Sequence, residues 1–126
     1  MRYGFVLYAG KDRQFEKVEY INDNLDWVKS KIGCEWIEVA NLPLFIEKSC
    51  LIVDESGLIK SEKPELNYIG SVLYGTPEHG HPIVGNVMLC SQEWNEHGID
   101  LVGFDIDTAN EIEKLLLQFQ EVREDD

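Results

Sequence analysis

The segment from residue 50 to residue 90 constrains the fold of this chain more than any other part of the sequence. It begins with an apolar run, CLIVD, which enters the turn Asp54-Glu55-Ser56-Gly57, and it ends with a second apolar run, PIVGNVMLC. Short apolar runs bounded by turn residues are typical of buried strands, and the apolar spacing between them favours a helix. The segment therefore predicts two strands of a sheet, the second over residues 83–90, a helix packed against them, and a polar loop at residues 76–82.

Further strands are predicted on both sides of that segment. The runs at residues 3–9, 14–21 and 35–42 are rich in aromatic and β-branched residues, as strands are. Residues 58–60 predict the returning strand of a hairpin, because Gly57 supplies the positive φ that its turn requires. The sheet is therefore expected to be mainly antiparallel.

Helices are predicted at three places by apolar residues spaced three and four apart. The first covers residues 25–32, and the second covers residues 64–75. The third begins at the capping box Thr108-Ala109-Asn110-Glu111. Its apolar face consists of Ile112, Leu115, Leu116, Phe119 and Val122. Together the elements predict one α+β domain over residues 1–126, a mainly antiparallel sheet with two short helices and a C-terminal amphipathic helix, in which residues 123–126 fray.

Composition narrows the classes of protein to which the chain can belong. Its 126 residues are 44% hydrophobic, enough for one domain with a real core, and its formal net charge is −13. No apolar stretch is long enough to span a membrane, and the N-terminus lacks the apolar region of a signal peptide, so we expect a cytoplasmic protein. The negative charge opposes direct binding of nucleic acid, and basic partners are favoured instead.

The cysteines and aromatic residues say less about the class of protein than the charge does. Cys34, Cys50 and Cys90 are widely spaced and form no Cys-x-x-Cys pair, which predicts reduced, buried thiols rather than disulfides or a metal site. The three Trp and five Tyr residues provide enough aromatic surface for a homo-oligomer, and they are equally suited to the core.

A family resemblance follows from these motifs. The runs CLIVDESGLIK, PELNYIGSVLYG and HPIVGNVMLC, in that order, resemble the DUF3846 family, and the upstream run IGCEWIEVANL fits its pattern as well. The chain departs from the family at Cys34, where Gly is usual, and in its acidic C-terminal region. DUF3846 proteins are common in phages and mobile elements of bacteria and have no assigned activity. The resemblance implies a setting in which small accessory proteins neutralise host defences by occluding a protein or sequestering a signal.

The polar loop and its flanks hold the residues best suited to a small ligand. Glycines around residues 75–85 free backbone N–H groups, the adjoining helix offers aromatic and amide side chains, and the hairpin turn adds carboxylates. The predicted ligand-binding residues are Asp54, Glu55, Asn67, Tyr74, Gly75, Thr76, His79, His81 and Asn86.

Catalysis and metal binding have weaker signals. His79 and His81 are separated by one residue, a spacing that places two imidazoles on one metal in an extended chain. A second hypothesis pairs either histidine with Asp54 or Glu55 for acid–base chemistry. No second pair has metal-ligand spacing, and no Ser or Cys has a nucleophile's setting. We therefore predict no catalytic residue, no metal and no cofactor, and a metal-dependent hydrolase is a third hypothesis.

Acidic residues concentrate toward the C-terminus, where residues 91–126 contain 11 of the 24. Such a face can imitate the charge spacing of a phosphate backbone and attract a basic protein surface, although acidic helix faces also serve solubility alone. The predicted partner-binding residues are Asp105, Asp107, Glu111, Glu113, Glu121 and Glu124.

We therefore expect a non-enzymatic binding protein of phage or mobile-element origin that modulates or inhibits a bacterial host defence factor with a basic surface. The alternative hypothesis is a protein that binds or sequesters a small molecule or nucleotide signal through residues 74–86.

Overall fold

A computed structural model of the chain describes residues 1–10, 12, 14–22, 24–42, 45–46, 48–55, 65–75 and 82–121. Over these residues the protein has the predicted α+β fold with an antiparallel sheet. Its elements are β1 (Tyr3–Leu7), β2 (Phe15–Glu19), α1 (Leu25–Ile32), β3 (Ile37–Asn41), β4 (Ser49–Asp54), α2 (Tyr68–Tyr74), β5 (Val87–Asn95), β6 (Gly98–Val102) and α4 (Ile106–Glu121).

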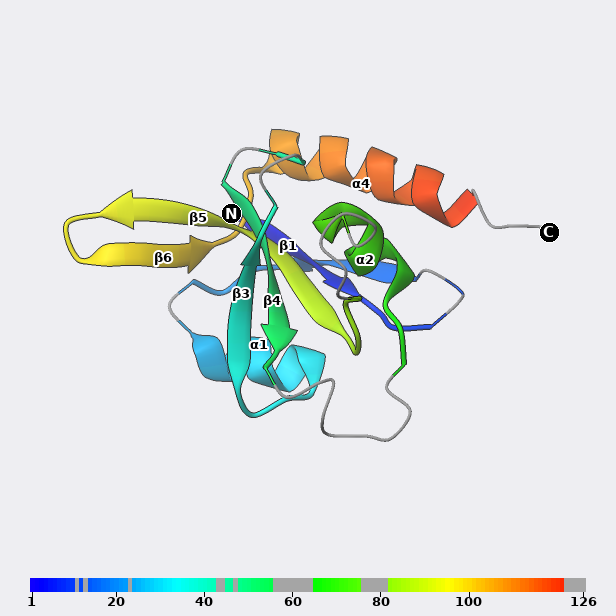
Figure 1. The fold of residues 1–126 in the computed structure, drawn as a ribbon. Helices are drawn as coiled ribbons and strands as arrows, with labels where there is room; N and C mark the ends of the chain where they lie inside the picture. Colours follow the sequence, from blue (N-terminus) through cyan, green and yellow to red (C-terminus); the bar gives the residue numbers. More distant parts are fainter. Residues whose placement is uncertain are drawn as a thin grey trace.

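The six strands form one sheet in the order β2-β1-β5-β4-β3, with β6 paired to β5 (Figure 1). β5 is the longest strand, and β4 pairs with one of its edges. β1 and β6 share the opposite edge, β1 beside Val87–Leu89 and β6 beside Ser91–Asn95. Tyr3 and Phe104 exchange two backbone hydrogen bonds of 2.8 and 2.7 Å, which join the start of β1 to the segment after β6.

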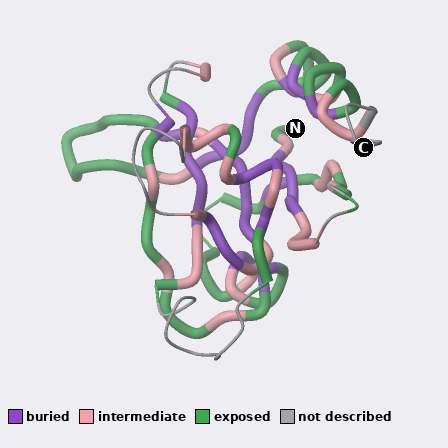
Figure 2. The backbone as a smooth tube through the Cα atoms, turned by 45° about the vertical axis from the view of Figure 1, so that its right-hand side comes forward, coloured by how far each residue is buried: buried purple, intermediate pink, exposed green. Residues whose placement is uncertain are grey.

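Alternating side chains give each face of the sheet its own core. Phe5, Leu51 and Leu89 belong to the core that contains residues of α2 and α4, whereas Ile52 and Met88 belong to the core that contains α1. In Figure 2 the buried backbone runs through the sheet strands, while the helices expose their outer sides. The sheet is therefore a middle layer between α1 on one side and α2 with α4 on the other.

Helix α1 has the predicted bounds because both of its end signals are local. The Asn24 side-chain oxygen accepts a hydrogen bond of 3.0 Å from the backbone N–H of Trp27, and Gly33 ends the helix with a φ of 73°. The predicted capping box of the last helix is wrong, since α4 begins two residues before Thr108. Its cap is Asp105, whose carboxylate accepts a hydrogen bond of 2.8 Å from the backbone N–H of Thr108.

The predicted apolar face of α4 is confirmed in part. Ile112 and Leu116 are fully buried and Phe119 is half-buried, whereas Leu115 is exposed. Val122 lies outside the described residues. The helix therefore packs on the sheet mainly through a stripe one side chain wide.

Helix α2 is shorter than predicted, because it begins at Tyr68 instead of residue 64. Leu66 forms a bridge with Val84 rather than a helical turn, and Asn67 caps the helix. The end of α2 is as predicted, with Gly75 in the left-handed region at a φ of 78°.

Strand β5 begins later and ends later than predicted. The predicted start at Ile83 is wrong because Gly85, with a φ of 74°, bends the chain before the strand begins. β5 then continues past Cys90 to Asn95 and turns back as β6, a hairpin that was not predicted. This hairpin extends beyond the rest of the sheet (Figure 1).

The remaining expectations concern the strand at residues 58–60, the C-terminal end, the cysteines and membrane-spanning helices. The predicted strand at residues 58–60 and the fraying of residues 123–126 fall outside the described residues. Cys34, Cys50 and Cys90 form no disulfide; Cys50 and Cys90 are buried as predicted, and Cys34 is half-buried. Across the described ranges, no helix has the length and apolar character needed to cross a membrane.

Candidate functional site

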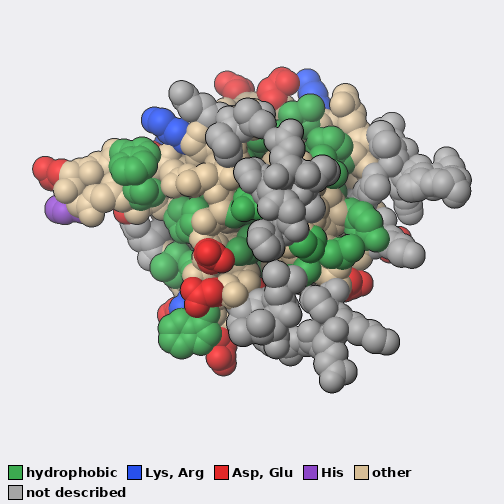
Figure 3. All heavy atoms as spheres, viewed as in Figure 1, with side chains coloured by type: hydrophobic (Ala, Val, Ile, Leu, Met, Phe, Trp, Pro, Cys, Tyr) green, Lys and Arg blue, Asp and Glu red, His purple; other side chains and the backbone are tan. Residues whose placement is uncertain are grey.

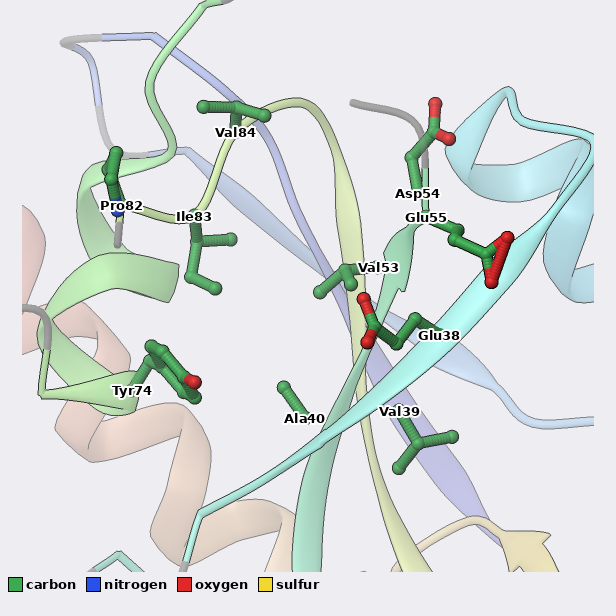
Figure 4. Close-up of a pocket in the computed structure, with 10 residues that line it drawn as sticks. All are labelled: Glu38, Val39, Ala40, Val53, Asp54, Glu55, Tyr74, Pro82, Ile83 and Val84. Atoms are coloured by element: carbon green, nitrogen blue, oxygen red, sulfur yellow. The ribbon is translucent and has the colours of Figure 1, made fainter. Parts of the chain in front are cut away.

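A groove of about 320 Å³ lies between β3 and β4 on one side and Tyr74 with the Pro82–Val84 segment on the other (Figure 4). Its lining combines carboxylates with apolar side chains. The described lining residues are Glu38, Val39, Ala40, Val53, Asp54, Glu55, Tyr74, Pro82, Ile83 and Val84.

The register of the β3–β4 pair determines which side chains reach the groove. Ala40 lies opposite Leu51 and Glu38 lies opposite Val53, and Leu51 belongs to the core beneath α2 and α4. Because side chains alternate along a strand, Glu38 and Ala40 point toward the α2 side, whereas Ile37 packs on the α1 side. Figure 4 shows the Glu38 carboxylate and Ala40 on the side of the groove that faces Tyr74.

The opposite wall of the groove is held in place by hydrogen bonds to α2. The backbone N–H of Ile83 donates to the Ser71 hydroxyl at 2.9 Å, and the Ile83 carbonyl accepts from the backbone N–H of Asn67 at 2.8 Å. Tyr74, the last residue of α2, contributes its ring to the same wall. This wall is therefore fixed to a helix and not carried by a free loop.

The electrostatics of the groove favour a cation. Glu38 and Glu55 are exposed, Asp54 is half-buried, and no Lys or Arg stands among the described lining residues. Figure 3 shows acidic side chains beside apolar ones over β3. A long basic side chain suits such a site, because its methylene groups can pack on the apolar wall while its charged end meets the carboxylates.

Three of the predicted ligand-binding residues meet in this groove: Asp54, Glu55 and Tyr74. Gly75 and Asn86 are not among the lining residues; Gly75 caps α2, and the Asn86 side-chain oxygen accepts a hydrogen bond of 2.9 Å from the backbone N–H of Ala9.

Asn67, another predicted ligand residue, is fully buried and hydrogen-bonded within the protein. Its amide nitrogen donates to the carbonyls of Leu7 at 2.9 Å and Gly85 at 2.8 Å, and its side-chain oxygen accepts from the backbone N–H of Gly70 at 2.8 Å. Asn67 therefore connects β1, α2 and the segment before β5.

The remaining predicted ligand residues, Thr76, His79 and His81, lie outside the described residues. Within the described part of the chain, no group of three or more His, Cys, Asp or Glu residues is arranged to hold a metal ion. The hypothesis of a metal at the two histidines stays a prediction.

Glu38 and Ile83 line the groove although the sequence did not predict either as a site residue. Glu38 has a recognisable signal, since it stands two residues before Ala40 and therefore shares one face of a predicted strand with it. That signal becomes useful only when the strand is known to lie at the edge of the sheet beside α2. Ile83 was assigned to a strand, whereas the structure places it before β5.

The acidic residues predicted to bind a partner are largely engaged by other parts of the protein. Asp105 caps α4, and its hydrogen bonds with Thr108 lower the pKa of its carboxyl. Glu113 forms an ion pair of 3.0 Å with Lys17 of β2, and Glu111 lies 3.7 Å from Lys114.

Of the other predicted partner residues, one is exposed on α4 and two lie partly or wholly outside the described residues. Asp107 is exposed in the first turn of α4. The Glu121 side chain and all of Glu124 lie outside the description.

A buried pair of thiols is the remaining group with potential chemistry. Cys50 and Cys90 lie directly opposite each other on β4 and β5, with 3.8 Å between their sulfur atoms. The hydrogen bond between them, together with burial, raises the pKa of the Cys90 thiol well above its usual value. A buried, protonated thiol is a poor nucleophile, so the pair serves packing.

The family model for DUF3846, a domain of unknown function, matches residues 1–116. The chain belongs to the DUF3846 family. Comparison with curated proteins and with solved structures found no match.

The DUF3846 match confirms the resemblance. It reaches residue 116, so it includes most of α4 and the acidic residues from Asp105 to Glu113. These acids belong to the family domain and are not part of an appended tail. The groove, formed by residues 38–84, lies wholly inside the DUF3846 region as well.

Proposed function

We propose that this DUF3846 domain is a non-enzymatic binding protein whose partner presents basic side chains to the groove between β3–β4 and the Pro82–Val84 segment. In keeping with the family's occurrence in phages and mobile elements, the proposed partner is a bacterial host factor, and the consequence of binding is modulation or inhibition of that factor.

The observation that carries this proposal is the pairing of carboxylates with an apolar wall in one groove. Glu38 and Glu55 present exposed carboxylates beside Val53, Tyr74 and Ile83. The net charge of −13 adds a long-range field that steers a basic protein toward any acidic surface of the chain. The groove then selects among basic partners by shape, which a field alone cannot do.

Helix α4 offers less as the contact surface. Two of its acids pair with lysines of the chain, and a third forms its cap, so their charges are already partly neutralised or engaged. Charge reversal in the groove and charge reversal on α4 should therefore affect partner binding differently, and the two sets of variants can be compared directly.

The test measures binding of a fluorescent peptide in which Lys alternates with Val, by anisotropy at low and moderate salt. Peptides with Gln or Glu in place of Lys provide the neutral and acidic comparisons. We expect binding of the Lys peptide alone, weakening as salt increases. The double variant Glu38→Lys with Glu55→Lys should lose binding. The matched variant Asp107→Lys with Glu111→Lys changes the net charge by the same amount on α4 and should retain it.

Other results would overturn the proposal. Equal binding of the Lys and Gln peptides excludes a cationic partner. Equal losses in both double variants mean that the overall field, and not the groove, attracts the peptide. Loss in the α4 variant alone transfers the contact to the acidic helix.

A second candidate function is suggested by the size of the groove. A volume of about 320 Å³ lies at the lower end of the range for small-molecule sites. The carboxylates oppose a nucleotide and favour an organic amine, so a polyamine is the suitable probe. A rise in melting temperature with spermidine, absent in the Glu38→Lys, Glu55→Lys variant, would support this function.

A further inference from the structure

Strand β3 is an outer strand of the sheet, and its pairing with β4 fixes the direction of its backbone groups. The backbone N–H of Leu42 donates to the Ser49 carbonyl at 3.1 Å, and that of Glu55 donates to the Trp36 carbonyl at 2.9 Å. The two bonds continue the β3–β4 register by one residue at either end. In an antiparallel pair, hydrogen-bonded positions alternate with non-bonded ones. The even-numbered residues of β3 therefore bond to β4.

The odd-numbered residues of β3 consequently direct their N–H and C=O groups away from the sheet. These residues are Ile37, Val39 and Asn41. No described strand pairs with this edge, and Val39 keeps 40% of its surface exposed. The edge is also regular: five consecutive residues stay in register with β4, without a bulge, and the strand contains neither Pro nor Lys.

Exposed edges of this kind are a template for another strand, and proteins usually protect them. The one charged residue of β3, Glu38, points into the groove. It therefore discriminates by charge: an acidic strand is repelled, and a basic strand is attracted. A second copy of this chain, which also carries −13, is disfavoured for the same reason.

We infer that β3 accepts an extended segment of a basic partner as an additional antiparallel or parallel strand. Alternate residues of that segment are Lys or Arg and lie over Glu38 and the groove, while the residues between them are β-branched or small and lie beside Val39. This inference rests on the proposed function and deepens it, because it states how the partner is held.

The geometry of a sheet supports this arrangement. An added strand lies about 4.8 Å from β3, and its side chains alternate in step with those of β3. A residue opposite Glu38 therefore points to the same face as Glu38 and Ala40, where the groove opens. A long basic side chain there can neutralise Glu38 and continue toward Val53. The backbone contributes affinity and the alternate side chains contribute specificity.

The first test changes the backbone of the peptide and leaves its charges intact. Two versions of the Lys–Val peptide carry N-methyl groups, one on alternate residues and the other on the intervening ones. An added strand presents only one set of N–H groups to β3. We therefore expect one methylated peptide to lose affinity by about tenfold or more and the other to bind as before. Equal affinities, or equal losses, would overturn strand addition.

The second test changes the protein. Val39→Pro removes one outward N–H and places a ring on the edge without removing a hydrogen bond to β4. We expect this variant to melt near the wild-type temperature and to bind the unmethylated peptide about tenfold more weakly. Val39→Thr keeps the donor and should bind normally. If Val39→Pro does not fold, the methylated peptides still decide the question.

The outcomes separate this inference from the proposed function. If no basic peptide binds, the proposed function fails. If binding depends on Glu38 and Glu55 but ignores both N-methylation and Val39→Pro, the groove is the contact and strand addition is wrong. A dimer of the free chain that dissociates in Val39→Pro would show that the edge is occupied by a second copy, which also overturns the inference.

Discussion

Replacement of Asn67 by Ala should destabilise the fold more than its small size suggests. The Asn67 side chain is fully buried and makes three hydrogen bonds, to Leu7, Gly85 and Gly70, at 2.8–2.9 Å. A hydrogen bond contributes about 1 kcal/mol, and the abandoned partners stay buried, so we expect the free energy of unfolding to fall by about 3 kcal/mol or more. This is a large part of the roughly 5–15 kcal/mol that holds a domain together.

The assay is urea unfolding followed by tryptophan fluorescence, with the slope against urea checked for constancy between variants. Asn86→Ala is the matched control, because among the described residues it removes one hydrogen bond, with Ala9, from a half-buried site. We expect a loss of about 1 kcal/mol there. Similar losses in the two variants, or a loss of less than about 1 kcal/mol for Asn67→Ala, would refute the view that Asn67 joins β1, α2 and the β5 approach.

Asn67→Asp refines the same prediction. It preserves the shape and the acceptor for Gly70 but replaces the donor nitrogen with an oxygen that faces two carbonyls. At neutral pH the variant should be at least as unstable as Asn67→Ala, since a charge is buried without a donor. Burial raises the pKa of such a carboxyl, so acidification should restore part of the stability by protonating it. If the stability of Asn67→Asp instead decreased steadily as the pH was lowered from neutrality, this account would be contradicted.

Three further predictions concern the cap of α4 and the thiols. Asp105→Ala should lower the melting temperature more than Asp105→Asn does, because Asn retains the acceptor for Thr108 and loses only the charge. Since the folded-state pKa of Asp105 is lowered, the stability that its charge provides is present above the carboxyl's unfolded pKa and should be lost as pH falls through the folded one; an Asp105→Asn variant with the same acid profile as wild type would exclude this. A thiol reagent should modify the half-buried Cys34 in the native protein and Cys50 and Cys90 only after unfolding. Absorbance counts the thiols that have reacted, and simultaneous reaction of all three in the native protein would contradict the burial of Cys50 and Cys90. The folded-state pKa of Cys90 is raised, so the contribution of its thiol to the free energy of unfolding is complete below about pH 8.5 and declines as pH rises above that value. The urea midpoints of wild type and Cys90→Ala should therefore converge at alkaline pH. Midpoints that keep the same difference at every pH would contradict this prediction.

Elements whose signals are local could be predicted from the sequence. Helix α1 is capped at both ends by neighbours in the chain, Asn24 and Gly33, and its bounds are as predicted. The start of α2 was misplaced because the cap residue, Asn67, is oriented by carbonyls far away in the sequence. Local preference at residue 64 suggested an earlier start, and tertiary hydrogen bonds determined a later one.

The candidate site could be predicted only in part for the same reason. Asp54, Glu55 and Tyr74 were identified from turn and helix patterns. Glu38 joins them because β3 is the outer strand of the sheet, and strand order is not encoded in any short segment. The β5–β6 hairpin was missed because polar residues such as Glu93 and Asn95 hide its alternation.

The shared edge of β5 has a consequence for how the chain folds during synthesis. β1 is made first, yet one of its edges is satisfied only by Val87–Leu89 and its first residue by Phe104. Contacts this distant in sequence form late and slow the folding of a domain. A nascent chain would therefore hold β1 and β2 as an incomplete pair until the segment from Val87 to Phe104 has left the ribosome. The antiparallel sheet of this domain is therefore completed only after the segment that follows β6 has been synthesised.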